Sequence, residues 1–463
     1  MASKMSNLNL GKTPVGQLLF KLSIPSMAGL LANALYMIIN GVYLGKFVGP
    51  EALGGVTVAY PMQMILFAFT LLFGTGGGTL LSIAYGAKDN SKVKKIIAST
   101  LIFGVITYIA LCILTFIFIE PILIAFGGTG ATLEHGKTYL LLLLPFFTSQ
   151  GLALIYENFL RSSGNSIMPM ITMISGAIVN ILLGYIFIPV LEMGTVGAGL
   201  ATGMAETFGF IVLFIYIRAK AHHLRATFNK FAVSFKIFRE VVASGFAAFA
   251  NQLAFSIRAL VLNILALRLG GENALIMVGI ITRLDSFVVI PVFGITHGLR
   301  PIVGYAYGGN NYDRIKDCLK IALISATVFL TAMFILIVTL TPQIMGIFVN
   351  DIELIEYGIP ILVLTHAGLS IIGFNLIGGM FFQSIKRNKM AFFFSLFSPL
   401  ILFVPLTIIM ANITSNIWAV WAVYPLVDGI TCIIIIIALI LVVRKLKTEI
   451  ALRKEQEVIS SEE

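Results

Sequence analysis

Residues 84–90 read AYGAKDN, and residues 306–310 read AYGGN. The two phrases begin 222 positions apart, and each follows a long apolar run. The same shift aligns further residues along the chain: Ala52-Leu53 with Ala274-Leu275, Gly76 with Gly298, Glu134 with Glu356, and Phe159 with Phe381. Agreement at one shift over more than a hundred residues predicts an internal duplication.

The composition is that of a membrane protein. Of the 463 residues, 58% are hydrophobic and only 11% are charged. Soluble domains carry roughly a quarter charged residues, so this chain cannot cover a water-facing surface. Apolar stretches of about 20 residues, the length of a helix that crosses a bilayer, recur throughout. The sequence therefore predicts an all-α polytopic membrane protein.

The apolar segments number twelve and divide six and six. They are 18–44, 52–84, 95–119, 138–160, 167–190, 195–217, 240–267, 274–304, 318–341, 357–382, 390–411 and 416–443. Six helices return the chain to its starting side, so the halves are parallel repeats, an architecture of secondary transporters. We predict two pseudo-symmetric six-helix bundles, at 1–217 and 240–445, with a cytoplasmic inter-lobe loop at 218–239 and a cytoplasmic tail at 446–463.

The basic residues set the orientation. Of the 31 Lys and Arg residues, 26 fall on the side that holds both termini and the 218–239 loop. This bias predicts that both termini are cytoplasmic in a multi-pass protein of the cell membrane. It also accounts for the net charge of +10 through anionic lipid, with no nucleic acid as a partner.

Several function classes are excluded by missing motifs. The polar start followed by a long apolar segment does not suggest a cleaved signal. The helices contain no GxSxG, HExxH or paired-Asp pattern, so we do not expect an enzyme. Cys112, Cys318 and Cys432 are far apart in sequence, which argues against a metal site or a disulfide framework.

Long motifs resemble one known family. They are YMIINGVYLGKFVGPEALGG (36–55), FGTGGGTLLSIAYGAKDN (73–90), NFLRSSGNSIMPM (158–170), NILLGYIFIP (180–189), VGAGLAT (196–202), FGITHGLRPIVGYAYGGNN (293–311) and WAVYPLVDGI (421–430). With these motifs the chain resembles the multidrug and toxic compound extrusion (MATE) transporters, in the bacterial branch that includes DinF-like and MepA-like exporters. The resemblance covers nearly all of 15–445. It implies twelve helices in two bundles, and export of bulky, often cationic compounds driven by inward Na⁺ or H⁺ flow, with no other cofactor.

The ion-coupling acids that the resemblance implies are replaced. Asn40 stands where relatives of this branch often have an Asp in the first helix. In the fifth helix Asn180 matches the family pattern, but Gly184 stands at the acid position. Thr202 in the sixth helix also matches.

Glu206 is the candidate replacement. It follows Thr202 by four residues, hence on the same helix face. If the helices meet as in relatives, its carboxylate lies near Asn40, Asn180 and Thr202, where it could bind Na⁺ or a proton. The alternative is a packed structural Glu that hydrogen-bonds to a hydroxyl group.

A second group of intramembrane charges lies in the later helices. Arg258 and Asp285 lie at similar depth in adjacent antiparallel segments, so we predict an ion pair between them. Asp428 lies at comparable depth and could share Arg258. A static salt bridge and a proton-switched network both remain open, and we expect His366 to have a hydrogen-bonded structural role.

Substrate contacts are predicted on the helices that line the cleft in relatives. Aromatic, Met and amide side chains suit varied cationic ligands. The candidates are Tyr36, Met37, Gln63, Met64, Gln252, Phe255 and Phe287.

The leading hypothesis is a monomeric antiporter for small organic compounds in membrane lipid. The alternatives are a lipid-linked oligosaccharide flippase of the same superfamily and an uncoupled homologue that acts as a carrier or sensor. A flippase would be expected to have extra helices or a cationic central cavity.

Overall fold

A computed structural model describes residues 9–226, 233–349 and 351–462, and every regular element among them is a helix. Internal contacts divide the chain into two compact units. Unit 1 is Met1–Thr13 with Lys21–Phe249, and unit 2 is Pro14–Phe20 with Ala250–Glu463. The division after Phe249 falls ten residues beyond the predicted inter-lobe loop.

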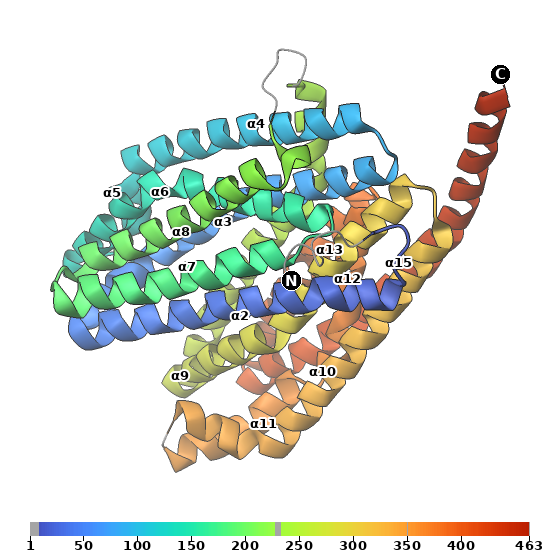
Figure 1. Cartoon of the computed structure of the whole chain (residues 1–463). Coiled ribbons are helices and arrows are strands. Elements are labelled where there is room, and N and C mark those ends of the chain that lie inside the picture. Colours follow the sequence, from blue (N-terminus) through green and yellow to red (C-terminus); the bar gives the residue numbers. More distant parts are fainter. Residues whose placement is uncertain (1–8, 227–232, 350, 463) are drawn as a thin grey trace. The chain divides into compact units, whose positions relative to one another are not determined.

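Unit 1 contains the first six spans (Figure 1). Its helices are α2 (Val15–Phe47), which enters the unit at Lys21, α3 (Pro50–Gly86), α4 (Asn90–Ile117), α5 (Ile119–Ala125), α6 (Gly130–Ser162), α7 (Ile167–Tyr185) with the π-helix η1 (Ile186–Val190), α8 (Gly194–Ala219) and the short η2 (His222–Leu224).

Unit 2 contains the later spans. Its helices are α9 (Phe235–Gly308), which enters the unit at Ala250, α10 (Tyr312–Phe348), α11 (Ile352–Thr365), α12 (Leu369–Ser384), α13 (Asn388–Leu396), the π-helix η3 (Phe397–Phe403), α14 (Val404–Thr414) and α15 (Ile417–Glu462).

The predicted twelve-helix fold is confirmed. Ten helices of the described chain are long and apolar enough to cross a membrane, and α11 with α12 forms an eleventh, bent span. The 74-residue α9 supplies two spans, because Gly271 at φ 65° interrupts it. The segment predicted as one helix at 357–382 is bent by 48° between Thr365 and Leu369.

The repeated phrase forms the same turn in both halves. After α3, Lys88 has a φ of 57°, and the side chain of Asp89 accepts a hydrogen bond from the first turn of α4. After α9, Asn310 has a φ of 53°, and Asn311 caps α10 in the same way. Each matched pair differs by 222 positions, so the duplication repeats a helix stop followed by a capped helix start.

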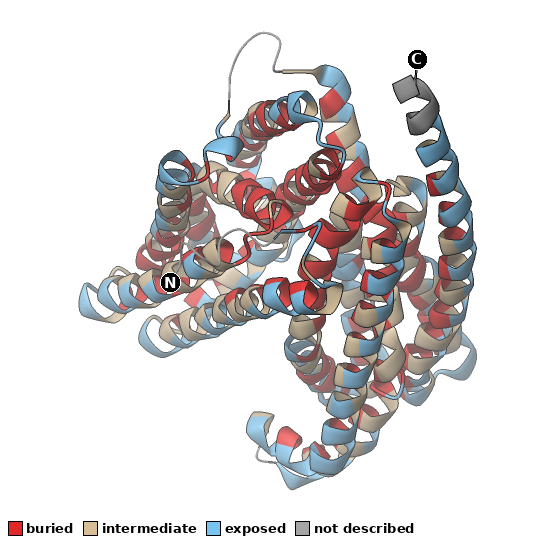
Figure 2. Cartoon of the chain, turned by 45° about the vertical axis from the view of Figure 1, so that its right-hand side comes forward, coloured by how far each residue is buried: buried red, intermediate tan, exposed pale blue. Residues whose placement is uncertain are grey.

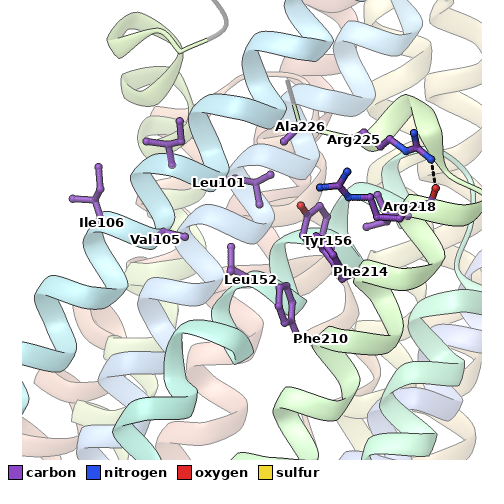
Figure 3. Close-up of a pocket in the computed structure, with 12 residues that line it drawn as sticks. Leu101, Val105, Ile106, Leu152, Tyr156, Phe210, Phe214, Arg218, Arg225 and Ala226 are labelled. Carbon is purple, nitrogen blue, oxygen red and sulfur yellow. Dashed lines mark hydrogen bonds between the residues drawn. The ribbon is translucent and has the colours of Figure 1, made fainter. Parts of the chain in front are cut away.

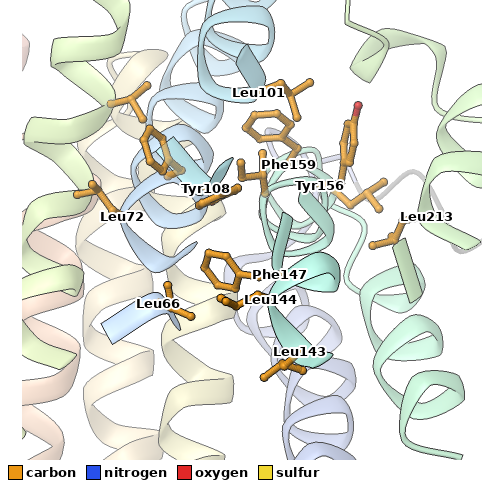
Figure 4. Packing of buried hydrophobic residues seen from close by; sticks show 14 of the residues in the cluster. Leu66, Leu72, Leu101, Tyr108, Leu143, Leu144, Phe147, Tyr156, Phe159 and Leu213 are labelled. Atoms are coloured by element: carbon orange, nitrogen blue, oxygen red, sulfur yellow. The ribbon is translucent and has the colours of Figure 1, made fainter. Parts of the chain in front are cut away.

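Leucine and aromatic side chains fill the interior of unit 1 (Figure 4). Tyr108 of α4 is fully buried and meets the rings of Phe73 and Phe147 edge to face, with centroids 5.7 and 5.5 Å away. Gly151 of α6 makes room for it, since a Cβ there would lie 2.3 Å from the Tyr108 ring. This packing holds α3, α4 and α6 together.

Many residues on the helices are exposed (Figure 2), and large apolar side chains are among them. Phe116 of α4 is 63% exposed and Val328 of α10 is 64% exposed, and many other large apolar side chains are similarly open. Apolar exposure on this scale suits hydrocarbon and not water.

Candidate functional site

Glu206 of α8 lies inside unit 1 and is held by a neighbouring helix. Gln150 of α6 donates a hydrogen bond from Nε2 to Glu206 Oε1 at 2.5 Å. The other carboxylate oxygen, Oε2, is buried and has no hydrogen-bond partner among the described residues. The phenol of Tyr36, from α2, is close enough to interact electrostatically with this carboxylate. Glu206 thus keeps one oxygen available in a buried, polar surrounding.

Asn180 and Thr202 meet across α7 and α8. The Asn180 amide donates to Thr202 Oγ1 at 3.5 Å, and Thr202 in turn donates to the Ala198 carbonyl oxygen at 3.0 Å. The carbonyl oxygen of the Asn180 side chain is buried and receives no hydrogen bond from the described chain. The hydroxyl of Tyr139, from α6, faces Thr202.

Asn40 lies beside Gly184, the two positions where the family resemblance implies acids. A Cβ at Gly184 would lie 3.3 Å from Asn40 Oδ1 and 3.3 Å from the Tyr43 ring. Asn40 Oδ1 is also buried without a hydrogen-bond partner in the described part of the chain. Because Gly184 has no side chain, Asn40 and Tyr43 of α2 occupy the space beside it.

Three buried oxygen atoms of unit 1 are candidates for binding a cation. Glu206 Oε2, Asn180 Oδ1 and Asn40 Oδ1 are buried acceptors on three different helices, α8, α7 and α2. Oxygen donors of this kind suit a hard cation, and a buried carboxylate can alternatively hold a proton. Their roles stay a prediction.

The sequence did not single out two residues beside these groups. Gln150 and Tyr139 carry no charge at neutral pH, and an uncharged polar side chain in a membrane helix is a weaker indication of a site than an ionised one. For Gln150, the presence of a polar amide within a largely apolar helix could have indicated a functional position. The side chain of Glu206 hydrogen-bonds to Gln150, and among the described residues no hydrogen bond joins it to Asn40, Asn180 or Thr202.

In unit 2 the predicted ion pair between Arg258 and Asp285 is wrong. Asp285 Oδ1 lies 3.3 Å from Nε2 of the buried His366. The guanidinium of Arg258 lies instead over two aromatic rings, 4.0 Å from the Phe403 centroid and 4.8 Å from that of Tyr424. Stacking on these rings stabilises the planar guanidinium of Arg258 through cation–π interactions, without a carboxylate partner.

Asp428 and His366 lie at the bend between α11 and α12. A Cβ on Gly368 would come within 2.4 Å of Asp428 Oδ2, so the carboxylate packs directly against this break. His366 is close to the Leu362 carbonyl oxygen through Nδ1, at 2.9 Å, at the end of α11. Arg258, Asp285 and Asp428 are near enough for electrostatic interaction, although the predicted direct pair does not form.

The substrate-contact candidates differ in exposure. Met37 is 46% exposed, and Phe255 and Phe287 are each 42% exposed. Tyr36, Gln63, Met64 and Gln252 are partly buried. Tyr36 belongs to the Glu206 surroundings, and Gln63 faces Tyr139. Their part in substrate binding stays a prediction.

Curated relatives cover most of the chain. The multidrug export protein MepA of Staphylococcus saprophyticus subsp. saprophyticus is 26% identical over 411 residues, which are 89% of this chain and 90% of that protein. MepA of Staphylococcus aureus strain N315 matches with the same identity and coverage.

Solved structures share the fold. An outward-facing multidrug resistance MATE family transporter of the MOP superfamily superposes with a TM-score of 0.90 at 23% identity, over 96% of this chain and 99% of that one. A MOP superfamily transporter from Pyrococcus furiosus has a TM-score of 0.90 at 23% identity, over 95% of this chain and 98% of that one. Residues 25–186 and 247–409, which are more than half of the sequence, match the MatE family. The chain is therefore a member of the MatE family.

Proposed function

We propose that this chain is a cation-coupled antiporter that exports amphipathic, often cationic organic compounds by alternating access. Membership of the MatE family and relatives named as multidrug export proteins support this proposal. In this proposal the protein works as a monomer in the cell membrane with both termini in the cytoplasm. The bias of Lys and Arg residues supports that orientation.

The buried Glu206 carboxylate is the observation that carries the coupling part of the proposal. One of its oxygens is fixed by Gln150, and the other is available to Na⁺ or H⁺. Acceptors from Asn40 and Asn180 belong to the same unit and are also buried without partners in the described chain.

Ion binding at these residues would link three helices. Glu206, Asn180 and Asn40 stand on α8, α7 and α2, so a bound cation would favour the arrangement in which their oxygens converge. An ion shifts a conformational equilibrium only through such a difference in affinity between states. A cation that binds one arrangement better than the other could therefore drive alternating access.

The test is efflux of ethidium from proteoliposomes under an imposed Na⁺ or H⁺ gradient. Wild-type protein is compared with Glu206→Gln, which keeps the side-chain shape and removes the charge. Glu51→Gln, at an exposed acid in the first turn of α3, is the charge-matched control. We expect one gradient to drive efflux in wild-type and control protein, and Glu206→Gln to lose the gradient-driven part.

A binding measurement separates the two ions. If Na⁺ binds at Glu206, NaCl raises the melting temperature of the purified wild-type protein above that in equimolar KCl, and Glu206→Gln removes the difference. Efflux that remains gradient-driven in Glu206→Gln refutes the assignment of Glu206. Absence of gradient-driven efflux in correctly folded wild-type protein, over a panel of organic cations, refutes the antiporter proposal.

A further inference from the structure

A pocket of about 340 Å³ lies in unit 1 among α4, α6, α8 and the segment after η2 (Figure 3). Its walls are predominantly apolar. They include Leu101, Val105 and Ile106 of α4, Leu152 of α6, and Phe210 and Phe214 of α8. None of these residues is a candidate for binding the coupling ion.

Two arginines form one end of the pocket. Arg218 lies in the last turn of α8, and Arg225 follows η2. Arg225 donates a hydrogen bond to the main-chain carbonyl oxygen of Arg218. The Arg218 guanidinium lies 5.1 Å from the Phe214 ring centroid. Figure 3 shows the Arg218 guanidinium beside Tyr156, and the Arg225 guanidinium directed at the Arg218 carbonyl oxygen.

The two positive charges have no acidic partner in the described chain. The ion pairs there involve other residues, and neither Arg218 nor Arg225 takes part. Both residues are exposed. Two adjacent cations without a carboxylate attract an anion and repel the organic cations proposed as export substrates.

The apolar part of the pocket opens outward. Ile106 is 57% exposed and Phe214 is 38% exposed, whereas Tyr156 at the base is 7% exposed. The α8 span ends at Ala219, so the arginines lie where the helix leaves the apolar region. A ligand here would place a hydrocarbon chain along α4 and α8 and an anionic head beside the arginines.

We propose that this pocket binds an anionic phospholipid. The phosphate contacts Arg218 and Arg225, the Tyr156 hydroxyl lies near Arg218, and one acyl chain occupies the apolar walls. Basic pockets between membrane helices on the cytoplasmic side suit such head groups. The predicted orientation places this site in the cytoplasmic leaflet. The proposal is independent of the coupling site.

The experiment is native mass spectrometry of the full-length protein in a neutral detergent, titrated with phosphatidylglycerol or phosphatidylcholine. Arg218→Gln/Arg225→Gln removes both charges. The matched control, Lys316→Gln/Lys320→Gln, removes two exposed charges from α10 of the other unit. Each basic group near a head group contributes about fivefold in affinity, so the arginine variant should bind phosphatidylglycerol about 25-fold more weakly.

A second variant tests the apolar walls. Val105→Trp keeps both arginines and fills the pocket, so we expect it to lose the tightly bound lipid as well. Size-exclusion profiles and melting temperatures establish that each variant is folded. Equal retention of phosphatidylglycerol by wild-type and arginine-variant protein would overturn the proposal. An equal loss in the lysine control would overturn it in favour of diffuse surface charge.

Inorganic phosphate separates a lipid site from a simple anion site. Millimolar phosphate should leave the phosphatidylglycerol adduct in place, because the acyl chain supplies part of the affinity. Displacement of the lipid by phosphate, or equal binding of phosphatidylcholine and phosphatidylglycerol, would contradict the proposal.

Discussion

Replacing Gly245 by Ala should separate two helices of unit 1. Gly245 lies in the first part of α9, and a Cβ there would lie 1.8 Å from the Leu72 carbonyl oxygen of α3. On the opposite helix, a Cβ at Gly76 would lie 2.2 Å from the Val241 carbonyl oxygen. The two backbones are therefore in direct contact, as small residues allow between membrane helices.

The size of the effect follows from that distance. An ordinary contact begins at 3.4 Å, so the helices must part by about 1.6 Å. The atom that would be struck belongs to the main chain, so no side-chain rotation can relieve the clash. Overpacking costs about 1–3 kcal/mol. The gain in helix propensity from Gly to Ala is about 1 kcal/mol. Because the clash is with the main chain, we take the upper end of the overpacking range and expect a net loss of about 2 kcal/mol.

The assay is thermal unfolding of the purified full-length protein. Gly279→Ala is the control, because it lies on the same helix α9 and a Cβ there meets no atom within 4 Å. We expect Gly245→Ala to melt clearly below wild-type protein and Gly279→Ala to melt at or above it. Equal melting temperatures for the two variants would refute the close-contact reasoning.

Three further predictions concern charged groups. Arg258→Lys should lower stability by about 1–2 kcal/mol in thermal unfolding, because an ammonium cannot stack flat on the two rings; unchanged stability would contradict this. A double-mutant cycle of Asp285→Asn and His366→Gln should give a coupling free energy of about 0.5–1.5 kcal/mol, whereas strict additivity would exclude a direct interaction. Desolvation, with the nearby His222 charge, lowers the pKa of His223. As the pH falls below about 6.5, the His223 side chain binds a proton in the unfolded chain before it does so in the folded protein. Wild-type protein should therefore lose more stability between pH 7 and 5 than His223→Gln, and equal slopes would refute the shift.

The architecture could be read from the sequence because local patterns dictate it. Apolar length forces a bilayer-spanning helix wherever about 20 such residues occur. The repeated AYG phrase marked the same turn in both halves, because a left-handed residue and a capping side chain act within a few positions of each other. The departures from the family pattern at Asn40 and Gly184 could also be read from the sequence, because each lies in a motif that is continuous along the chain.

The bend between α11 and α12 could not be predicted in this way. The segment 357–382 has the apolar length of one straight span, yet the helix breaks at His366–Gly368. The Asp428 carboxylate, from α15, packs against the break. That contact joins residues about sixty positions apart, and no local pattern records it.

The pairing of charged groups within the spans likewise depended on packing in three dimensions. Equal depth along two helices suggested Arg258 with Asp285, but depth fixes only one coordinate. The rotational position of each helix about its own axis also matters. It places the Arg258 side chain over two aromatic rings and the Asp285 side chain beside His366. In the same manner, Glu206 was identified from the sequence, whereas its partner Gln150 was not. The sequence determined which ionisable groups lie within the apolar spans, and the tertiary structure decided which of them meet, because side-chain direction depends on how neighbouring helices rotate and pack.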